Sequence, residues 1–404
     1  MRPKLRPVDM QWIQHNGQPA LLLRDPLGLS DRMVVVPRSL ALLVGLCDGT
    51  RDIAGLRIAF ELRTGLRLDT GTLERLIEQL DEALLLEGPR ADERQAKALE
   101  EFRSLPFRPP ALAGQGYPAD PEELARTLES YGGYIEPGDA QSSTPPVRGL
   151  ICPHIDFSRG GRTYAQVWAK AREAVREAEL VILLGTDHAG SPGRMTLTRQ
   201  NYATPFGVLP TARDIVDSIA AAVGEEASFA EELHHRREHS IELAAVWLHY
   251  TRGREPCHLV PILCGSFQPF TTGEAHPRQD SGMEAALRVL REVLEGRRAL
   301  VVAAADLAHV GPAFGDSLPI GLVERASLAG NDARLLSLAA SADADGFLAE
   351  VRREGDRRRI CGLPPIYLAL RLLEGARGEA MGYAQCPADT SGTSFVSIAG
   401  VILR

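Results

Sequence analysis

The second part of the chain alternates short apolar runs with amphipathic segments. The runs are LVILLG at 180–185, CHLVPILCG at 257–265 and ALVVAAADL at 299–307. Apolar residues recur every three or four positions at 282–296 and 363–375, which is the spacing of one helix face. Strands that alternate with helices are typical of α/β domains with a mainly parallel sheet. We therefore predict an α/β fold for residues 106–404.

The first 90 residues have a different pattern. The runs ALLLRDP and MVVVP predict two short strands in a hairpin-like pair. An amphipathic helix capped by Asp69 or Thr70 is predicted by apolar residues at helical spacing, namely Leu73, Leu76, Ile77, Leu80 and Leu84. We divide the chain into a domain at 1–90, a charged helical linker at 91–105 that ends in prolines, and the α/β domain at 106–404. A Pro/Ser/Thr-rich loop is predicted at 136–146.

Composition narrows the classes of partner. Lys and Arg number 45 against 53 Asp and Glu, a net charge of −8, which argues against a general nucleic-acid binder. No apolar run approaches the roughly 18 to 20 residues of a membrane span, and the N-terminus lacks the apolar segment of a secretory signal. The six cysteines have irregular spacing and form no disulfide framework. We expect a cytoplasmic protein with no nucleic-acid or membrane partner.

Histidines and aspartates follow three of the predicted strands. The pairs are His154 with Asp156 after GLICP, Asp187 with His188 after LVILLG, and Asp306 with His309 after LVVAAA. In open α/β sheets the loops at the carboxyl ends of strands converge over one edge and form the functional site. One histidine after a strand would be unremarkable. Three such pairs predict a shared polar site.

Cys361 lies in the segment RRRICGLPPI, just before a predicted helix. Pro364 and Pro365 suit the first turn of a helix, where no backbone N–H is needed. A helix N-terminus and the preceding arginines at 357–359 would both favour a thiolate, the nucleophilic and metal-binding form of cysteine. The alternative is a buried, inert cysteine.

A fourth group of candidates lies in HHRREHSIELAAVWLHY. His239 and Glu242 are three residues apart and so share one helix face, pointing at a site or at buried polar partners. His234 and His235 are expected on a solvated face. The metalloprotease motif is absent, because Arg236 stands where that motif has a glutamate.

Two histidines with one anionic ligand and open positions are typical of non-haem Fe(II) sites. A thiolate ligand shifts the preference toward copper, zinc or iron. We find no phosphate-binding P-loop and no dinucleotide-binding glycine motif.

Eight segments of the second part of the chain form an ordered set: FRPPALAGQGYPADPEELARTLESY, PHIDFSRGG, LLGTDHAG, TPFGVLPTA, EHSIEL, VPILCGSF, AADLAHVGP and ICGLPPI. In this order they resemble the motifs of the MEMO-like family, also called AmmeMemoRadiSam system protein B. The likeness covers residues 106–404. It implies a three-layer α/β fold similar to the LigB-type class III extradiol dioxygenases, which are built around non-haem iron.

The resemblance also implies roles for single residues. The implied metal ligands are His154, His188 and Cys361. His309 matches an acid–base histidine, with Asp306 beside it. His239 would line the same pocket, and Glu242 is a further catalytic candidate. Where many relatives have PHAG and GPSH, this chain has PHID and GTDH, so Asp156 and Asp187 would make the pocket more acidic. The dioxygenases have a glutamate where this chain has the cysteine, which argues against ring cleavage.

The N-terminal unit resembles PqqD-like domains, which are winged-helix-like α+β modules. The likeness rests on CDGTRDIAGL and LERLIEQLDEALLLEG, and it implies a peptide or protein ligand. The alternative is a small helical cap that extends the core.

Three functions remain open from the sequence. The first is a metal-dependent redox enzyme that uses Fe(II) or copper and works with a radical-SAM protein and a third protein of the same system. The second is a non-catalytic metal-binding or scaffold protein that retains the pocket. The third, a zinc hydrolase, fits a thiolate-rimmed site less well.

Overall fold

The computed structural model describes residues 1–132 and 145–404, so most of the predicted loop at 136–146 lies outside the described residues. The chain forms two compact units, Met1–Ser104 and Leu105–Arg404, here called unit 1 and unit 2. The segment predicted as a linker forms helix α4 (Pro89–Ser104), which belongs to unit 1.

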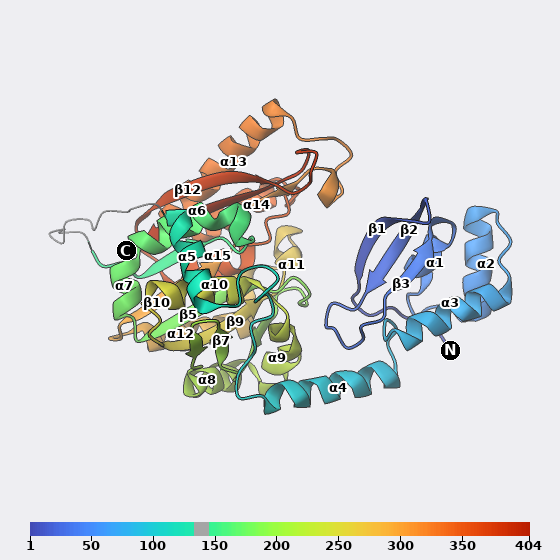
Figure 1. Ribbon diagram of the computed structural model, residues 1–404, viewed down its shortest axis with the longest axis horizontal. Helices are drawn as coiled ribbons and strands as arrows, with labels where there is room; N and C mark the ends of the chain where they lie inside the picture. The colour runs from blue at the N-terminus through green and yellow to red at the C-terminus, as the bar shows by residue number, and fades with distance from the viewer. Residues whose placement is uncertain (133–144) are drawn as a thin grey trace. The chain divides into compact units, whose positions relative to one another are not determined.

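Unit 1 combines a small antiparallel sheet with helices (Figure 1). The predicted pair of strands is confirmed as β2 (Gln18–Arg24) and β3 (Val34–Pro37). Strand β1 (Asp9–His15) was not predicted, because its mostly exposed side chains lack the apolar pattern of a buried strand. The helices are α1 (Ala41–Leu46), α2 (Ile53–Thr64) and α3 (Thr70–Glu82). The Asp69 carboxylate accepts a hydrogen bond from Thr72 N and caps α3, as predicted.

One hydrophobic core holds unit 1 together. The predicted apolar face of α3, with Leu73 and Leu80 fully buried, packs against Leu56 and Phe60 of α2. Leu23 of β2 is fully buried in the same cluster. Unit 1 therefore has a core of its own.

Among the described residues of unit 2, eight strands form one sheet in the order β11-β13-β4-β10-β5-β9-β6, with β12 paired to β13. The central four are parallel: β4 (Gly149–Cys152), β10 (Ala299–Ala304), β5 (Leu180–Thr186) and β9 (His258–Cys264). The others run antiparallel: β6 (Met195–Leu197), β11 (His309–Val310), β12 (Gly378–Pro387) and β13 (Phe395–Leu403). The sheet is thus mixed, and the predicted parallel arrangement holds for its centre.

Helices cover both faces of this sheet, because side chains alternate along each strand. Val181 and Leu183 belong to a cluster with α5 (Pro121–Gly132), α6 (Phe157–Lys170), α7 (Arg172–Glu177) and α10 (Ser240–Thr251). Ile182 and Leu184 belong to a second cluster with α8 (Arg213–Val223), α12 (Ser281–Leu294), α13 (Leu322–Ala340), α14 (Ala344–Arg353) and α15 (Leu363–Leu372). The unit has three layers, as predicted.

The parallel strands end at one level. In the register of the sheet, Ala304 of β10 lies beside Cys152 of β4 and beside Gly185 of β5. The residues that follow these strands therefore leave the sheet at the same edge. In the part of the chain that the structure describes, no helix is long and apolar enough to cross a membrane.

Candidate metal centre

The structure brings His154, His188 and Cys361 together at the carboxyl edge of the sheet. One ligand atom from each lies within 4.8 Å of the others, and Cys361 Sγ is 3.3 Å from His154 Nε2. His154 follows β4, His188 follows β5, and Cys361 precedes α15. The side chain of His188 is 39% exposed, so the cluster is open to solvent on that side.

His154 is held by the end of strand β10. Its ring is buried, and its Nδ1–H donates to the carbonyl oxygen of Ala304 at 3.0 Å, which leaves Nε2 facing Cys361. The Asp306 carboxylate accepts hydrogen bonds from the backbone N–H groups of His154 (2.8 Å) and Ile155 (3.2 Å). A fixed Nδ1–H is the usual way in which a protein orients a metal-binding histidine. Asp306 is thus a positioning residue.

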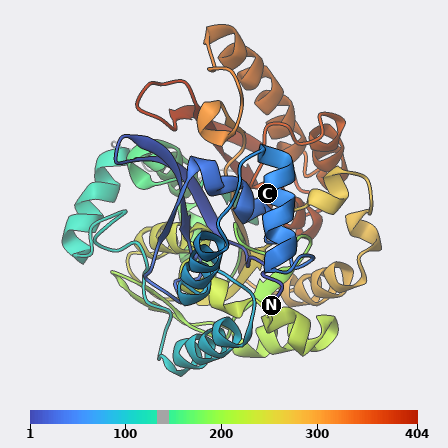
Figure 2. The same cartoon turned by 90° about the vertical axis from the view of Figure 1, so that its right-hand side faces the viewer.

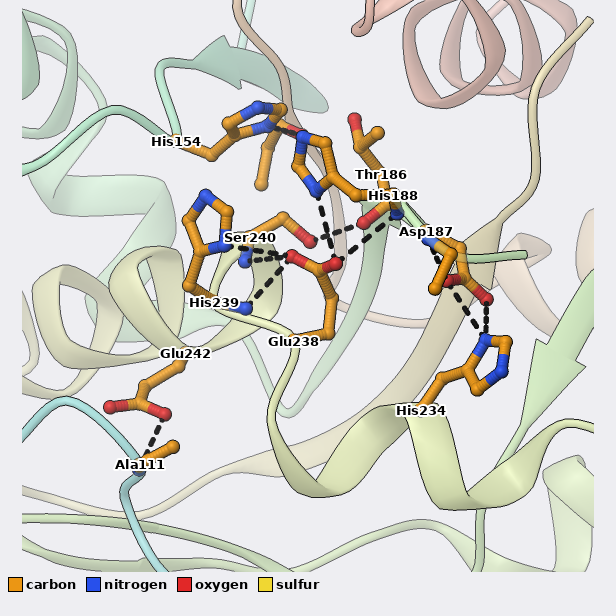
Figure 3. Close-up of polar contacts among 12 residues, drawn as sticks. Ala111, His154, Thr186, Asp187, His188, His234, Glu238, His239, Ser240 and Glu242 are labelled. Carbon is orange, nitrogen blue, oxygen red and sulfur yellow. Dashed lines mark hydrogen bonds and ion pairs between the residues drawn. The ribbon is translucent and has the colours of Figure 1, made fainter. Parts of the chain in front are cut away.

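His188 is held by Glu238, a residue that the sequence analysis missed. The Glu238 carboxylate lies 3.0 Å from His188 Nδ1 and also accepts hydrogen bonds from the backbone N–H groups of His239 (2.8 Å) and Ser240 (2.9 Å). Figure 3 shows the ring of His188 between His154 and this carboxylate. Glu238 stands in the segment EHSIEL, directly before a predicted site histidine, and that adjacency was the available signal.

His239 adds a third imidazole to the cluster. Its ring stacks on His188, with centroids 5.0 Å apart, and lies edge-on to His154 at 5.5 Å. Its Nδ1 is 3.2 Å from the Glu238 carboxylate. Burial lowers the pKa of His239 to about 4, although the Glu238 charge opposes this. His239 is therefore a neutral imidazole at neutral pH and a weak base.

The turn that carries Cys361 packs directly on the strand ends. The backbone N–H of Gly362 donates to the Asp306 carbonyl oxygen at 3.1 Å, and the Thr186 hydroxyl donates to the Cys361 carbonyl oxygen at 3.2 Å. A Cβ on Gly362 would clash with Asp306 O and lie 2.6 Å from Ala305 Cβ. Only a glycine permits this approach. The close packing brings Cys361 Sγ to the edge of the sheet.

Cys361 is predisposed to be a thiolate, as predicted, but through the neighbouring histidines rather than the arginines. Burial would raise the pKa of the thiol. The charges of His154 and His309, with hydrogen bonds from His154 and His188, outweigh burial and lower the pKa to about 5.

The neighbouring arginines contribute little, because carboxylates already pair with them. Arg358 binds Asp332 and Glu354, Arg359 binds Asp316 at 2.6 Å, and Arg357 lies 3.8 Å from Glu354. The thiolate therefore depends on the histidines.

The same charges act on the histidine. Burial would lower the pKa of His154, but the charges of Asp306 and Cys361 raise it to about 9. The pKa of His188 is likewise raised, against burial, chiefly by Glu238. Without a metal, the centre is a thiolate between imidazolium rings.

His309 opens strand β11, and its backbone N–H donates to the carbonyl oxygen of Arg358 at 2.7 Å, in the segment that leads to Cys361. Its Nδ1 lies 3.2 Å from the carbonyl oxygen of Arg359 and 3.3 Å from that of Leu307. Since a carbonyl only accepts, Nδ1 carries a proton and donates it to these oxygens.

Glu242 does not belong to the centre, contrary to the prediction. Its buried carboxylate forms an ion pair with Arg108 and accepts hydrogen bonds from Ala111 N (2.8 Å), Leu112 N (2.8 Å) and Tyr117 Oη (2.6 Å). Figure 3 shows it turned away from the imidazoles and toward Ala111. Helix spacing predicted Glu242 near His239, but its carboxylate instead pairs with Arg108, a buried arginine far away in the sequence.

Asp156 is also not a pocket residue. Its carboxylate caps helix α6 by accepting from Arg159 N at 3.1 Å, and it pairs with the Arg159 guanidinium. The two glycines of PHIDFSRGG do not form a turn but lie inside α6, and a Cβ on Gly161 would clash with the ring of Tyr131. Asp156 therefore caps the start of α6, and the two glycines allow the helix to pack closely.

Asp187 faces away from His188 and binds His234 Nδ1 at 2.9 Å. Two further groups have possible ligand atoms: His188, Glu238 and His239, which share the centre described above, and Asp187, Glu231 and His234. In the last group the guanidinium of Arg194 lies 3.8 Å from Glu231, so cationic groups already balance the carboxylates. His234 and His235 were expected in solvent, which is wrong. His235 is fully buried between Tyr202 Oη and the Thr196 carbonyl oxygen, and burial lowers its pKa to about 3.

Two imidazoles and a thiolate lie at one edge of the sheet in a three-layer unit. The fold and this site define an α/β protein with a candidate metal centre. The chain belongs to the Memo-like protein family, whose model matches residues 108–402, as the ordered motifs predicted.

Three relatives show how far the similarity extends. The chain is similar to a MEMO1 family protein of Aquifex aeolicus, with 26% identity over 408 residues that cover all of both chains. It is 29% identical to a MEMO1 family protein of Thermus thermophilus over 323 residues, 80% of this chain and 90% of the relative. A MEMO1 family protein of Methanosarcina acetivorans is 27% identical over 306 residues, 74% of this chain and 100% of the relative. The whole archaeal relative thus matches about three quarters of this chain.

Replacing Glu242 by alanine should destabilise unit 2 and spare the metal centre. Loss of one partner of a buried ion pair typically costs about 3–5 kcal/mol. Denaturant unfolding followed by the fluorescence of Trp168 and Trp247, both in unit 2, measures the effect. The control is Glu122→Ala, which removes an exposed partner of Arg254 and should cost about 0–1 kcal/mol. Unchanged stability with lost metal binding would place Glu242 in the site after all.

In metal-free protein, Cys361 should be the first thiol to react with iodoacetamide at neutral pH. Its rate should stay nearly constant above about pH 6 and fall as the pH drops through about 5, because protonation removes the thiolate. Pulsed alkylation with peptide mapping measures this. Cys386 is the internal control, since burial raises the pKa of its thiol to about 11. Earlier labelling of Cys386 would contradict the charge arrangement described above.

Proposed function

We propose that this protein is a metal-dependent oxidoreductase whose centre holds Fe(II) or copper through His154, His188 and Cys361. The observation that carries the proposal is the distance of 3.3 Å between Cys361 Sγ and His154 Nε2, with a His188 nitrogen within 4.8 Å of both. Ligand atoms bound to one ion at about 2.0–2.3 Å lie at most about 4.6 Å apart. Small movements would therefore suffice for all three to bind one ion.

The donor set fits a transition metal. Both histidines have Nδ1 fixed by an acceptor, Ala304 O for His154 and the Glu238 carboxylate for His188, so Nε2 is the ligand atom in each. A thiolate with two imidazoles favours copper, iron or zinc over magnesium or calcium. Three protein ligands leave positions for a substrate, as in catalytic rather than structural sites.

A bound iron or copper ion would supply a one-electron redox couple and a Lewis acid at this edge of the sheet. The chain's own residues would then orient a bound group. His239, neutral because burial lowers its pKa to about 4, would accept a hydrogen bond from a group bound at the centre. His309, whose Nδ1–H is held by the carbonyl oxygen of Arg359, favours the thiolate of Cys361. The exposed side of His188 would admit the substrate.

The family resemblance also supports work beside a radical-SAM protein and a third protein of the same system. Co-purification with these two proteins would test that association, and its absence under conditions where the centre is loaded would count against it.

Protein prepared without oxygen should bind about one Fe(II) or copper ion per chain. His154→Ala and Cys361→Ser should lose most of it, whereas Asp156→Asn should keep it, since asparagine also caps helices. Elemental analysis of folded protein measures occupancy, and oxygen uptake or redox cycling of the bound ion measures reactivity. Full occupancy without any redox exchange would favour the non-catalytic alternative. Full metal occupancy in His154→Ala would show that His154 is not a ligand and would contradict the proposed centre.

Metal affinity should rise between about pH 6 and 8. His154, with a pKa of about 9 in the metal-free protein, carries a proton over this range, and binding must displace it. Each displaced proton strengthens apparent affinity by about tenfold per pH unit, until the pH passes the pKa of the imidazole. Competition with a chelator of known pH dependence measures the slope. An affinity independent of pH would contradict the imidazolium–thiolate arrangement.

Glu238→Gln should weaken metal binding by about 10- to 100-fold, the usual cost of losing a partner that orients a ligand. The glutamine keeps the size of the side chain but loses the charge that holds His188 and His239. The matched control is Glu231→Gln, a nearby carboxylate that binds Ser191 rather than the centre. Equal losses in both variants would show a general effect of charge.

A further inference from the structure

Helix α2 of unit 1 exposes a line of apolar side chains. Ile58, Leu62 and Leu66 are 52%, 82% and 53% exposed, and Ala54, one turn earlier, is also exposed. Ala54, Ile58 and Leu62 are four residues apart, so they lie above one another on one side of α2. Leu66, four residues further along, follows just after the end of the helix. We call these four residues the α2 stripe.

The opposite side of α2 is apolar as well. Leu56 and Phe60 are almost fully buried in the core of unit 1. A surface helix normally presents charged side chains opposite its buried face, and apolar residues on both sides are typical of helices covered on both sides. In Figure 1, α2 lies on the far side of α1 from the β1–β3 sheet. In Figure 2, which faces this side, no other element of unit 1 lies in front of α2.

Arginines stand beside the stripe. Arg57, Arg63 and Arg67 each neighbour a stripe residue in the sequence. Among the described residues, none of the three forms an ion pair with a carboxylate, and Arg57 only donates to Thr70 Oγ1 at 3.3 Å. The nearest acidic residue in the helix, Glu61, accepts from Leu68 N at 3.1 Å. The stripe is therefore an apolar line with three arginines and one glutamate beside it, a net positive charge.

Unit 1 is not required by the metal centre. All three groups of possible ligand residues found in the described part of the chain lie in unit 2. The Methanosarcina relative matches 74% of this chain over its whole length, while the Aquifex relative matches all of it. The family thus occurs with and without a segment of about this size. A separate core with an uncovered apolar stripe is suited to binding.

We propose that the α2 stripe is the docking surface for an acidic amphipathic helix of a partner protein. The charge pattern selects this occupant, because apolar side chains at helical spacing would cover the stripe while flanking Asp and Glu residues meet Arg57, Arg63 and Arg67. Ridges of residues four apart also pack well against a second helix. A membrane surface fits less well, since the stripe is one residue wide and Glu61 stands beside it.

The test uses the full chain and a labelled synthetic helical peptide with leucines at positions i, i+4 and i+7 flanked by glutamates. The wild-type protein should bind this peptide, measured by fluorescence anisotropy, and a peptide with lysines in place of the glutamates should bind at least about tenfold more weakly. Leu62→Glu should weaken binding of the glutamate peptide by about tenfold or more, the usual effect of losing a central apolar contact. Arg63→Glu should weaken it and reduce its dependence on salt.

Leu322→Glu is the matched control, because Leu322 of unit 2 is 83% exposed and Leu62 is 82% exposed. It should bind the peptide as the wild type does. Thermal unfolding should be the same for both variants and the wild type, since neither side chain is in a core. This comparison separates loss of docking from loss of fold.

Four results would overturn the proposal. They are no binding of the glutamate peptide, equal binding of the two peptides, binding unaffected by Leu62→Glu, and an alternative occupant of the stripe. A concentration-dependent dimer that Leu62→Glu abolishes would identify a second copy of this chain as that occupant. Binding to vesicles of phosphatidylserine and phosphatidylcholine that Leu62→Glu abolishes would identify a lipid surface.

Discussion

The common register of β4, β10 and β5 is the constraint on which the candidate centre depends. Because Cys152, Ala304 and Gly185 lie side by side, the residues after each strand leave the sheet at one level. Strand β10, between the other two, contributes no proposed ligand of its own. It supplies Ala304 O and the Asp306 carboxylate, which hold the ring and the backbone of His154. A shift of one residue in this register would turn His154 to the opposite face.

The layered fold and the convergence of the strand ends could be predicted because both depend on local patterns, whereas the ligand roles of His154, His188 and Cys361 came from the family resemblance. Apolar runs indicated the central strands, and the rule that loops converge at the carboxyl ends of parallel strands brought His154 and His188 together. The turn before α15 was recognisable from its prolines and glycine. The antiparallel strands at the sheet's edges have no such local signal, since their pairing depends on partners far away in the sequence.

Contacts between side chains that lie far apart in the sequence could not be predicted. Glu238 and Glu242 lie on the same short segment, and helix geometry favoured Glu242. Glu242 forms an internal ion pair because Arg108, 134 residues earlier in the chain, lies beside it. Glu238 is the glutamate that holds His188. The arginines before Cys361 were misjudged for the same reason, because Asp316 and Asp332 pair with them from distant elements. Glu242 and Arg358 are buried charges, and each is paired with an opposite charge, as burial requires.

The turn at Cys361 has a consequence for how the protein would keep its metal. Residues 154 and 361 are 207 positions apart, so their meeting is a contact that the chain completes only after α15 has packed on the sheet. An ion held between them would bind the native state and not the unfolded chain, and would stabilise it in proportion to the logarithm of the free metal concentration. Local opening of α15 would release the ion while the sheet remains intact. Metal occupancy would then show whether α15 is packed on the sheet, rather than whether the whole unit is folded.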